Sequence, residues 1–305
     1  MKHFIDIASH SPRKLQKLLD DAIALRKEWR AGGNKPLLKD KVLGMVFDKP
    51  SLRTRVSFEV AMHDFGGYAI YLSPGEVQLG VRESVPDVAR ILSGYVDAIM
   101  ARTFEHEHIV GLAKHGWVPV INGLSDYNHP CQAVGDALTI QEYKGTLKGL
   151  KVAYIGDGNN VATSLFHICT KLGAHFSIAS PKGYELPKTV VQQAKKFAAI
   201  SGSQILLTDD PHIAVKNADV IYTDTWTSMG QEEEVSVRAK KFSRYQVDKK
   251  LVSEAKKDVI VMHCLPAHRG EEITDEVMDG KHSVVFKQAE NRLHAQKAIL
   301  LHVLT

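Results

Sequence analysis

Apolar positions along the chain follow two alternating patterns. Short apolar runs such as Val42–Phe47 are typical of strands buried in a parallel sheet. Longer segments carry an apolar residue every three or four positions, as in the helix predicted over Pro12–Arg30. Further strands are expected at 68–72, 96–101, 118–121, 151–155, 176–179, 204–207, 219–222, 259–262 and 284–286, and a last helix at about 289–304. Strands alternating with helices predict an α/β protein with two doubly wound domains, each a parallel sheet flanked by helices.

A polar, glycine-containing stretch at 142–149 separates the two series of predicted strands. The chain has 305 residues, which is enough for two domains that each bury a core. We therefore predict a first domain over 1–145, joined by the C-terminal helix 289–305, and a second domain over 146–288.

Composition narrows the class of partner. The net charge of +4 is spread along the chain, so it favours small anionic ligands over nucleic acid. No apolar run approaches the roughly 18 residues of a membrane span, and the N-terminus lacks the apolar core of a signal peptide. Three widely spaced cysteines indicate free thiols in a reducing compartment. We expect a cytoplasmic protein with no membrane partner.

The segment after the strand Val42–Phe47 predicts an anion site. Pro50 and Ser51 stand where a helix begins, so free backbone N–H groups and the positive end of the helix dipole point outward there. Arg53 and Arg55 add charge suited to a dianionic phosphate. The alternative is a solvated basic helix start that caps itself.

Polar residues also follow other predicted strands, where open parallel sheets bind ligands. Arg102 follows 96–101 and is either a ligand or a solvated strand end. His129 and Gln132, in a His-Pro-x-Gln turn after 118–121, offer a donor to a carbonyl and an acceptor to an amide. Cys131 between them has no motif that places a base beside it, and we interpret it as a small buried residue.

The second half carries three more such segments. Residues 156–160 resemble the start of a dinucleotide fingerprint but lack its third glycine, so Asn160 either presents its amide to a carboxylate or caps a helix. Asp224 follows 219–222 and is suited to an ammonium group. His263-Cys264-Leu265-Pro266 is either a metal-ligand pair or, as we prefer, a bend whose carbonyls face a ligand. Arg292 stands out from the apolar face of the last helix.

Taken together, these motifs resemble the aspartate/ornithine carbamoyltransferase family, and its ornithine branch in particular, over essentially the whole chain. Ser-x-Arg-Thr-Arg and His-Pro-x-Gln mark the family. Asp-x-Trp-x-Ser-Met-Gly-Gln and His-Cys-Leu-Pro mark the ornithine branch. The resemblance implies transfer of the carbamoyl group of carbamoyl phosphate to the δ-amine of L-ornithine, giving L-citrulline and phosphate in arginine biosynthesis. It implies no cofactor and no metal, a carbamoyl phosphate-binding first domain and an ornithine-binding second domain.

The resemblance also implies the site residues. Those for carbamoyl phosphate are Ser51, Leu52, Arg53, Thr54, Arg55, Gln78, Arg102, His129, Gln132, Cys264, Leu265 and Arg292. Those for ornithine are Asn160, Asp224, Ser228 and Met229, and the catalytic residues are Arg102, His129, Asp224 and Cys264. Members of the family form homotrimers in which a neighbour's loop, matching 75–84 here with Gln78, completes the phosphate pocket.

One position departs from the family pattern. The usual loop reads Ser-Thr-Arg-Thr-Arg, and Leu52 replaces the first threonine. The lost hydroxyl costs on the order of 1–3 kcal/mol if its hydrogen bond goes to a charged oxygen. Leu52 therefore keeps open a carbamoyltransferase for N-acylornithine, and putrescine is a further alternative acceptor. A nucleotide-dependent oxidoreductase that uses 156–160 and a binding protein without catalysis are the competing interpretations from different functional classes.

Overall fold

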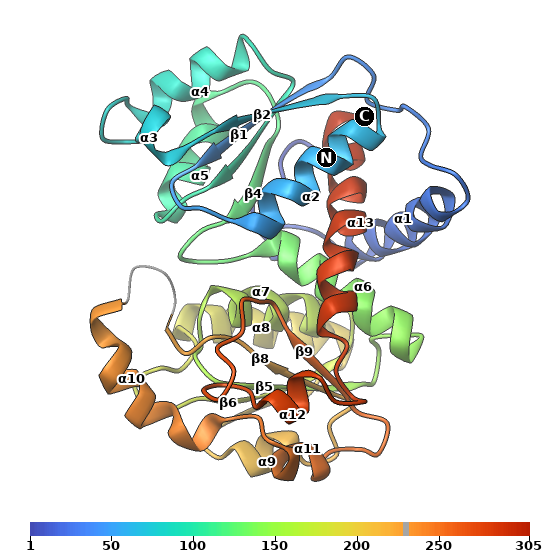
Figure 1. Ribbon diagram of the computed structural model, residues 1–305, viewed down its shortest axis with the longest axis vertical. Coiled ribbons are helices and arrows are strands. Elements are labelled where there is room, and N and C mark those ends of the chain that lie inside the picture. The colour runs from blue at the N-terminus through green and yellow to red at the C-terminus, as the bar shows by residue number, and fades with distance from the viewer. Residues whose placement is uncertain (228–231) are drawn as a thin grey trace. The chain divides into compact units, whose positions relative to one another are not determined.

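The computed structural model describes residues 1–227 and 232–305, which fold as two compact α/β units (Figure 1). The first unit is Met1–Leu138 with Glu290–Thr305, and the second is Thr139–Ala289. The chain passes between them within two helices, α6 (Pro130–Lys144) and α13 (Val285–Leu304). Among the described residues, no helix is long and apolar enough to cross a bilayer.

The first unit contains a four-stranded parallel sheet in the order β2-β1-β3-β4. Its strands are β1 (Val42–Phe47), β2 (Tyr68–Leu72), β3 (Ala98–Arg102) and β4 (Val120–Leu124). Its helices are α1 (Pro12–Arg30), α2 (Leu52–Asp64), α3 (Pro74–Val77), α4 (Val85–Ser93) and α5 (His106–His115), with parts of α6 and α13. Phe47 pairs with Arg102 and Arg102 with Leu124, so β1, β3 and β4 end side by side.

The second unit contains a five-stranded parallel sheet in the order β7-β6-β5-β8-β9. Its strands are β5 (Lys151–Ile155), β6 (His175–Ala179), β7 (Ile205–Thr208), β8 (Val220–Thr223) and β9 (Ile260–His263). Its helices are α7 (Asn160–Lys171), α8 (Lys188–Ser201), α9 (Pro211–Val215), η1 (Glu232–Glu234), α10 (Val235–Phe242), η2 (Ser243–Tyr245), α11 (Lys249–Ser253) and α12 (Asp275–Met278). The strand order reverses at β5 and β8, which is where open sheets of this kind bind ligands.

The predicted fold class is confirmed, and one predicted strand is wrong. β1, β2, β5 and α1 have the predicted bounds, and β3, β6, β7, β8 and β9 lie within two residues of theirs. β4 begins two residues and ends three residues later than predicted. The strand expected at 284–286 does not form, because α13 begins at Val285. Three apolar residues cannot distinguish a strand from the first turn of a helix. Here Val285 is buried and Phe286 exposed, and Ser283 just before them forms an isolated bridge with Val261 of β9.

Candidate active site

The carboxyl ends of β1, β3 and β4 carry most of the predicted phosphate residues of the first unit, whereas Gln78 follows α3 and Arg292 lies on α13. Ser51 is the N-cap of α2, and its Oγ accepts a hydrogen bond of 3.3 Å from the Thr54 backbone N–H. Leu52 is the first residue of α2, and its side chain is 74% exposed. Arg102 ends β3, and His129 precedes α6. Neighbouring strands thus bring together residues that are far apart in the sequence.

Four cationic side chains surround a buried histidine in this unit. We call Lys49, Arg53, Arg102 and Arg292 the cationic group; they belong to or adjoin β1, α2, β3 and α13. Burial of His129, and then the charges of the cationic group, hold the pKa of its imidazole well below the usual value. His129 is therefore neutral at physiological pH, where it can donate one N–H. The positive field around it favours a doubly charged anion.

Arg292 is held in this group by a close approach of helices. Its Nη2 donates to the Thr54 Oγ1 at 2.9 Å, although the two residues are 238 positions apart. Gly135 of α6 lets α13 come near, since a Cβ built on Gly135 would lie 3.2 Å from Cγ of Arg292. A side chain there would press on Arg292.

The side-chain oxygen of Gln132 remains available to accept a hydrogen bond. Its Nε2 donates to the Asp136 Oδ1 at 2.9 Å, while its Oε1 is buried and has no hydrogen-bond partner among the described residues. Cys131 beside it is buried, its Sγ donates to the Asn122 carbonyl at 3.2 Å, and burial raises the pKa of its thiol to about 12. Such a thiol is not a nucleophile, as the sequence predicted.

Arg55 and Gln78 make contacts outside the cationic group. Arg55 Nε donates to Glu59 Oε1 at 3.0 Å, and its guanidinium lies 3.9 Å from the ring centroid of Tyr71. Gln78 is exposed after α3 in the left-handed region, with φ of 46°.

Lys49 is a member of the cationic group that sequence reasoning missed. It is buried just after β1, and its Nζ lies 4.3 Å from the ring centroid of Phe104. Burial, and then the charge of Arg102, lowers the pKa of Lys49 to about 8. A lysine before a proline usually indicates a solvated turn, so no local signal marks this one as buried.

In the second unit the predicted ornithine residues Asn160 and Asp224 follow β5 and β8, and the predicted catalytic residue Cys264 follows β9. These strands lie in one sheet with β8 between the other two. Cys264 Sγ and the Thr225 backbone N–H each donate to the Asp224 Oδ1 at 2.8 Å. Asn159 Nδ2 donates to the Asp224 Oδ2 at 2.8 Å. We call these four residues the Asp224 network. Asn160, the first residue of α7, directly follows Asn159.

Asn159 has two roles that the sequence left unassigned. Its Oδ1 accepts hydrogen bonds from the backbone N–H groups of Val161 and Ala162, both at 3.0 Å, so it caps α7 while its amide holds Asp224. An asparagine before a helical segment is a recognisable cap. Its bond to Asp224, 65 positions later, has no such signal. Ser228 and Met229 lie outside the described residues.

A buried histidine and glutamate hold the bend after β9. Leu265 has φ of 61°, a conformation that costs a non-glycine residue roughly 1–2 kcal/mol. Its N–H donates to the His263 Nδ1 at 2.8 Å, and His263 Nε2 contacts Glu272 Oε1 at 2.9 Å. The side chains of His263 and Glu272 are completely buried. Because Nδ1 accepts, Nε2 carries the proton and donates to Glu272.

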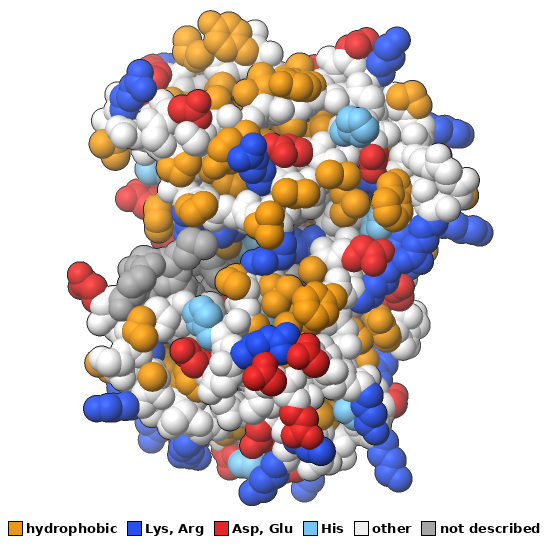
Figure 2. Space-filling model, viewed as in Figure 1, with side chains coloured by type: hydrophobic (Ala, Val, Ile, Leu, Met, Phe, Trp, Pro, Cys, Tyr) orange, Lys and Arg blue, Asp and Glu red, His pale blue; other side chains and the backbone are white. Residues whose placement is uncertain are grey.

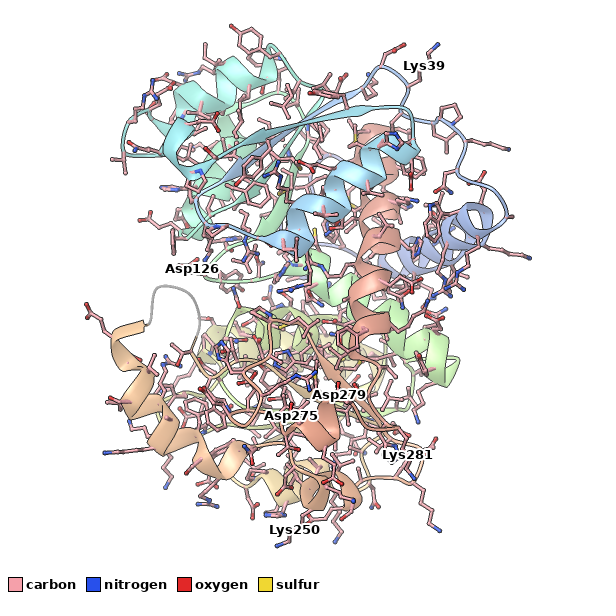
Figure 3. All side chains as sticks on the ribbon, in the orientation of Figure 1. Lys39, Asp126, Lys250, Asp275, Asp279 and Lys281 are labelled. Atoms are coloured by element: carbon pink, nitrogen blue, oxygen red, sulfur yellow. The ribbon has the colours of Figure 1, made fainter. Side chains whose placement is uncertain are left out.

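Sequence reasoning also missed Glu272, whose neighbour Glu271 is exposed. The Glu272 Oε1 accepts a second hydrogen bond, of 2.6 Å, from the His268 backbone N–H. Arg269 then ties this segment to the region of α12 by ion pairs with Asp275 and Asp279, which Figure 3 labels. Contacts of His263 before the bend, and of His268 and Arg269 after it, thus hold the bend in place.

Among the described residues, two clusters contain potential metal ligands. Asp224, His263 and Cys264 offer three ligand atoms within 4.8 Å of one another, as do His268, Glu271 and Glu272. In the first cluster both ring nitrogens of His263 already have hydrogen-bond partners, so an ion would have to displace one of them. That a metal plays no part stays a prediction.

The glycine-rich turn after β5 is covered by the chain itself. Gly158 N–H donates to the Tyr184 carbonyl at 2.8 Å, and a Cβ on Gly158 would lie 2.4 Å from the backbone nitrogen of Leu186. Asn159 already caps the helix that follows. A dinucleotide places its pyrophosphate against such a turn and helix start. The packing of this turn therefore argues against a nucleotide-dependent oxidoreductase.

Two family models match the chain. The model described as aspartate/ornithine carbamoyltransferase, carbamoyl-P binding domain, matches residues 2–142. The model described as aspartate/ornithine carbamoyltransferase, Asp/Orn binding domain, matches residues 148–303. The chain is 59% identical over 269 residues to a Bacillus subtilis protein named ornithine carbamoyltransferase, covering 88% of this chain and 84% of that one.

Two further similarities come from Pyrococcus furiosus. A protein named ornithine carbamoyltransferase, anabolic, is 54% identical over 298 residues, which cover 98% of this chain and 95% of that protein. A solved structure of ornithine carbamoyltransferase from the same organism superposes with a TM-score of 0.97 at 53% identity, covering 99% and 97% of the two chains.

Proposed function

Because the chain belongs to the aspartate/ornithine carbamoyltransferase family, we propose that it transfers the carbamoyl group of carbamoyl phosphate to the δ-amine of L-ornithine. The products are L-citrulline and phosphate. The observation that carries the choice of ornithine is the buried contact of Cys264 with Asp224. A carboxylate at this position suits a substrate ammonium group, whereas aspartate would require basic groups for its second carboxylate. One similar protein is named anabolic, which supports a role in arginine biosynthesis.

The cationic group and the start of α2 supply the proposed phosphate site. Ser51, Arg53, Thr54, Arg55 and the backbone N–H of Leu52 hold the phosphate, and Arg292 adds charge beside Thr54. Each positive charge also lowers the energy of the phosphate as it leaves. The burial of Lys49, Arg102 and Arg292 supports this assignment, because buried charges attract an anion more strongly than solvated ones.

The δ-ammonium group first loses a proton with the assistance of Cys264 and Asp224. The neutral δ-amine then attacks the carbamoyl carbon and forms the C–N bond, and the bond to the phosphate oxygen breaks as the tetrahedral intermediate collapses. Arg102 and neutral His129 donate to the carbonyl oxygen as it becomes an oxyanion. Gln132 Oε1, together with the carbonyls of Cys264 and Leu265, accepts from the carbamoyl amide. The amine proton passes from nitrogen to the departing phosphate.

Asp224 and Cys264 are the proposed catalytic pair for the amine. The Asp224 carboxylate binds the α-ammonium group of ornithine and, with the Cys264 thiol, orients the amine for attack. Asn160 donates to the α-carboxylate, and Ser228 and Met229 keep their predicted roles at the α-ammonium. Asn159, His263 and Glu272 act as positioning residues, since each holds a member of this pair or the bend that follows.

We extend the proposal to a cytoplasmic homotrimer in which Gln78 reaches the phosphate site of a neighbouring copy. Edge strand β2 exposes Tyr68 and Ile70, and Val81 in the loop after α3 is 87% exposed. Figure 2 shows hydrophobic side chains gathered on the visible face of the first unit. Exposed apolar residues on an edge strand favour self-association. Light scattering after gel filtration measures the mass; a monomer would contradict the trimer and the role of Gln78.

The test of function is citrulline formation from carbamoyl phosphate and L-ornithine by purified protein, with N-acetylornithine, putrescine and aspartate as parallel acceptors. We expect turnover with ornithine and little with the others. Preference for putrescine or N-acetylornithine would overturn the assignment of Asp224 to the α-ammonium. A protein inactive with every acceptor would favour a binding protein without catalysis.

A further inference from the structure

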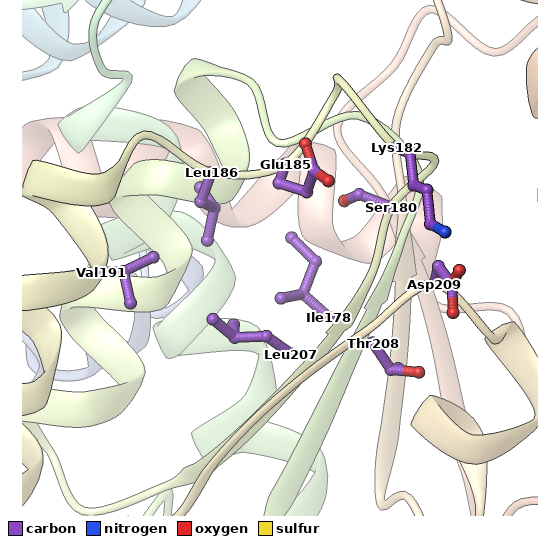
Figure 4. Close-up of a pocket in the computed structure, with 9 residues that line it drawn as sticks. All are labelled: Ile178, Ser180, Lys182, Glu185, Leu186, Val191, Leu207, Thr208 and Asp209. Carbon is purple, nitrogen blue, oxygen red and sulfur yellow. The ribbon is translucent and has the colours of Figure 1, made fainter.

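A pocket of about 440 Å³ lies at the carboxyl ends of β6 and β7, beside α8 (Figure 4). Its volume is within the range of small-molecule sites. The lining residues are Ile178, Ser180, Lys182, Glu185, Leu186, Val191, Leu207, Thr208 and Asp209. None of them is a proposed carbamoyl phosphate or ornithine residue, so the pocket is distinct from the site described above.

One end of the pocket is apolar. Figure 4 shows Leu186, Val191 and Leu207 gathered at this end, with Ile178 between it and the polar end. Leu207 is 46% exposed although its neighbours in the pocket are aliphatic. Leu186 and Ile178 are buried, so Leu207 is the exposed side chain of this apolar lining. An apolar lining of this kind is suited to covering an apolar group of a ligand.

The opposite end carries charged side chains of both signs, Lys182, Glu185 and Asp209, and a buried hydroxyl. Glu185 Oε2 already accepts a hydrogen bond of 2.8 Å from the Gly183 N–H. Lys182 and Asp209 lie on the same side of the pocket in Figure 4, beside Ser180. Ser180 is only 4% exposed, and its Oγ has no hydrogen-bond partner among the described residues. A buried hydroxyl without a partner is unfavourable, and a ligand carboxylate would supply the missing acceptor.

We infer that this pocket binds a free L-α-amino acid with a bulky apolar side chain. The ligand's carboxylate pairs with Lys182 and accepts from Ser180, and its ammonium group pairs with Asp209. Its side chain packs on Leu186, Val191 and Leu207. A ligand with only one charge leaves either Lys182 or Asp209 without its partner, so the pair selects for a zwitterion.

The wall of the pocket also contacts the loop that holds Asp224. Glu185 and Leu186 pack directly on Gly158, whose N–H donates to the neighbouring Tyr184 carbonyl. The next residue, Asn159, donates to Asp224. A ligand that shifts the wall therefore shifts the Asp224 network, and with it the affinity for ornithine. This effect on ornithine rests on the proposed function, whereas the binding does not.

Calorimetric titration of the whole protein with L-phenylalanine, L-leucine and L-tryptophan tests the site. We expect saturable binding, with D-phenylalanine, N-acetyl-L-phenylalanine and adenosine at least tenfold weaker. Lys182→Met and Leu207→Asn should each weaken binding at least tenfold. The matched controls Lys188→Met and Leu206→Asn change nearby residues outside the lining and should leave binding unchanged.

Three results would overturn the site: no saturation by any of the three amino acids, binding that survives both pocket variants, or saturation by adenosine alone. Lys182 is exposed, so its variant remains informative even if Leu207→Asn fails to fold. Saturating L-phenylalanine should then change the KM for ornithine by about fivefold or more. An unchanged KM with demonstrated binding would overturn the coupling. Absence of turnover with ornithine would overturn the proposed function and leave the binding result standing.

Discussion

The candidate site residues fall into two sets, one in each unit, which we call the first half and the second half, and the two sets depend on different physics. In the first unit, the cationic group gathers like charges around a buried neutral histidine, an arrangement that is costly until an anion arrives. In the second unit, the Asp224 network already gives each carboxylate oxygen a hydrogen-bond partner. The first half works through charge and the second through fixed geometry. Substitutions that remove charge should therefore act most in the first half, and those that loosen hydrogen bonds most in the second.

The strongest test of the charge argument is Arg102→Met. It removes a buried donor from the proposed oxyanion site, so kcat/KM should fall by about 100- to 1,000-fold. Steady-state rates of citrulline formation measure this. The control is Arg90→Met on α4, which removes an exposed arginine that pairs with Asp87 of its own helix turn. Equal activity of the two variants would contradict the assignment of Arg102.

Asp224→Asn tests whether the second half binds ornithine through the negative charge of Asp224 as well as through the shape of its side chain. The variant keeps the size of the side chain but loses the negative charge that binds the α-ammonium. We expect the KM for ornithine to rise about 100-fold while the KM for carbamoyl phosphate changes little. Asp258→Asn, which changes an exposed aspartate paired with Lys144, is the control. A larger effect on carbamoyl phosphate than on ornithine would reverse the comparison.

Glu272→Leu tests the geometric support of the bend after β9. The substitution leaves the His263 Nε2–H and the His268 backbone N–H without their acceptor. We expect the free energy of unfolding to fall by about 1–3 kcal/mol and kcat to fall with it. Urea denaturation measures the first and initial rates the second. Glu271→Leu changes the exposed neighbour, and an equal loss in both variants would show that Glu272 holds nothing in place.

Lys49 makes the charge of the first half dependent on pH. Its pKa of about 8 means that the cationic group loses one charge as pH rises through this value, so the KM for carbamoyl phosphate should rise there. The Lys49→Met variant should lack this step. Initial rates measured from about pH 6.5 to about pH 9.5 cover pH values below and above this pKa. They show whether the native protein has the step and whether the variant lacks it. An identical pH profile in the two proteins would contradict the assignment.

The lowered pKa of Lys49 also predicts how the stability of the folded protein changes with pH. The pKa of Lys49 is lower in the folded protein than in the unfolded chain, where it is about 10.5, so the unfolded chain binds more protons between these values. The cost of burying Lys49 is fully present below about pH 8 and disappears as pH rises toward 10.5. At about pH 7, Lys49→Met should therefore be more stable than the native protein by about 1–3 kcal/mol. Urea denaturation at neutral pH and near pH 10.5 should show this difference shrinking.

The smallest expected effect is that of Leu52→Thr. Restoring the family's hydroxyl should lower the KM for carbamoyl phosphate by about fivefold, or about 1 kcal/mol, because the position is largely exposed. Leu37→Thr changes another exposed leucine of the first unit and serves as the control. A gain in turnover of N-acetylornithine instead would connect position 52 to the choice of amine.

Local signals in the sequence predicted their elements well. The apolar run of β1, the period of α1 and the cap Ser51 depend on neighbouring residues, and the structure has each of them where the pattern placed it. The strand expected at 284–286 was wrong because three apolar residues carry too little period to identify an element. A long run with a clear period identifies a helix or a strand, whereas a run of three residues does not.

Residues that meet after strands were also foreseeable in part. Parallel strands place their carboxyl ends on one edge, so Arg102 and His129 in one sheet, and Asp224 and Cys264 in the other, were candidates from the sequence alone. The burial of Lys49 and the contact of Glu272 with His263 were not, because each depends on which side chain fills the space beside it.

The chain's local patterns thus established its class, its elements and most of its chemical groups, since these depend on periodicity and on residue type after a strand. Tertiary packing decided which of these groups meet and which of them are charged. Arg292 of α13 reaches Thr54 of α2 and lies close to Gly135 of α6, and Asn159 reaches Asp224 because β5 and β8 are neighbours. Burial then set the charge states, making His129 neutral and lowering the pKa of Lys49. Desolvation depends on every atom around a group, and those atoms come from distant parts of the chain.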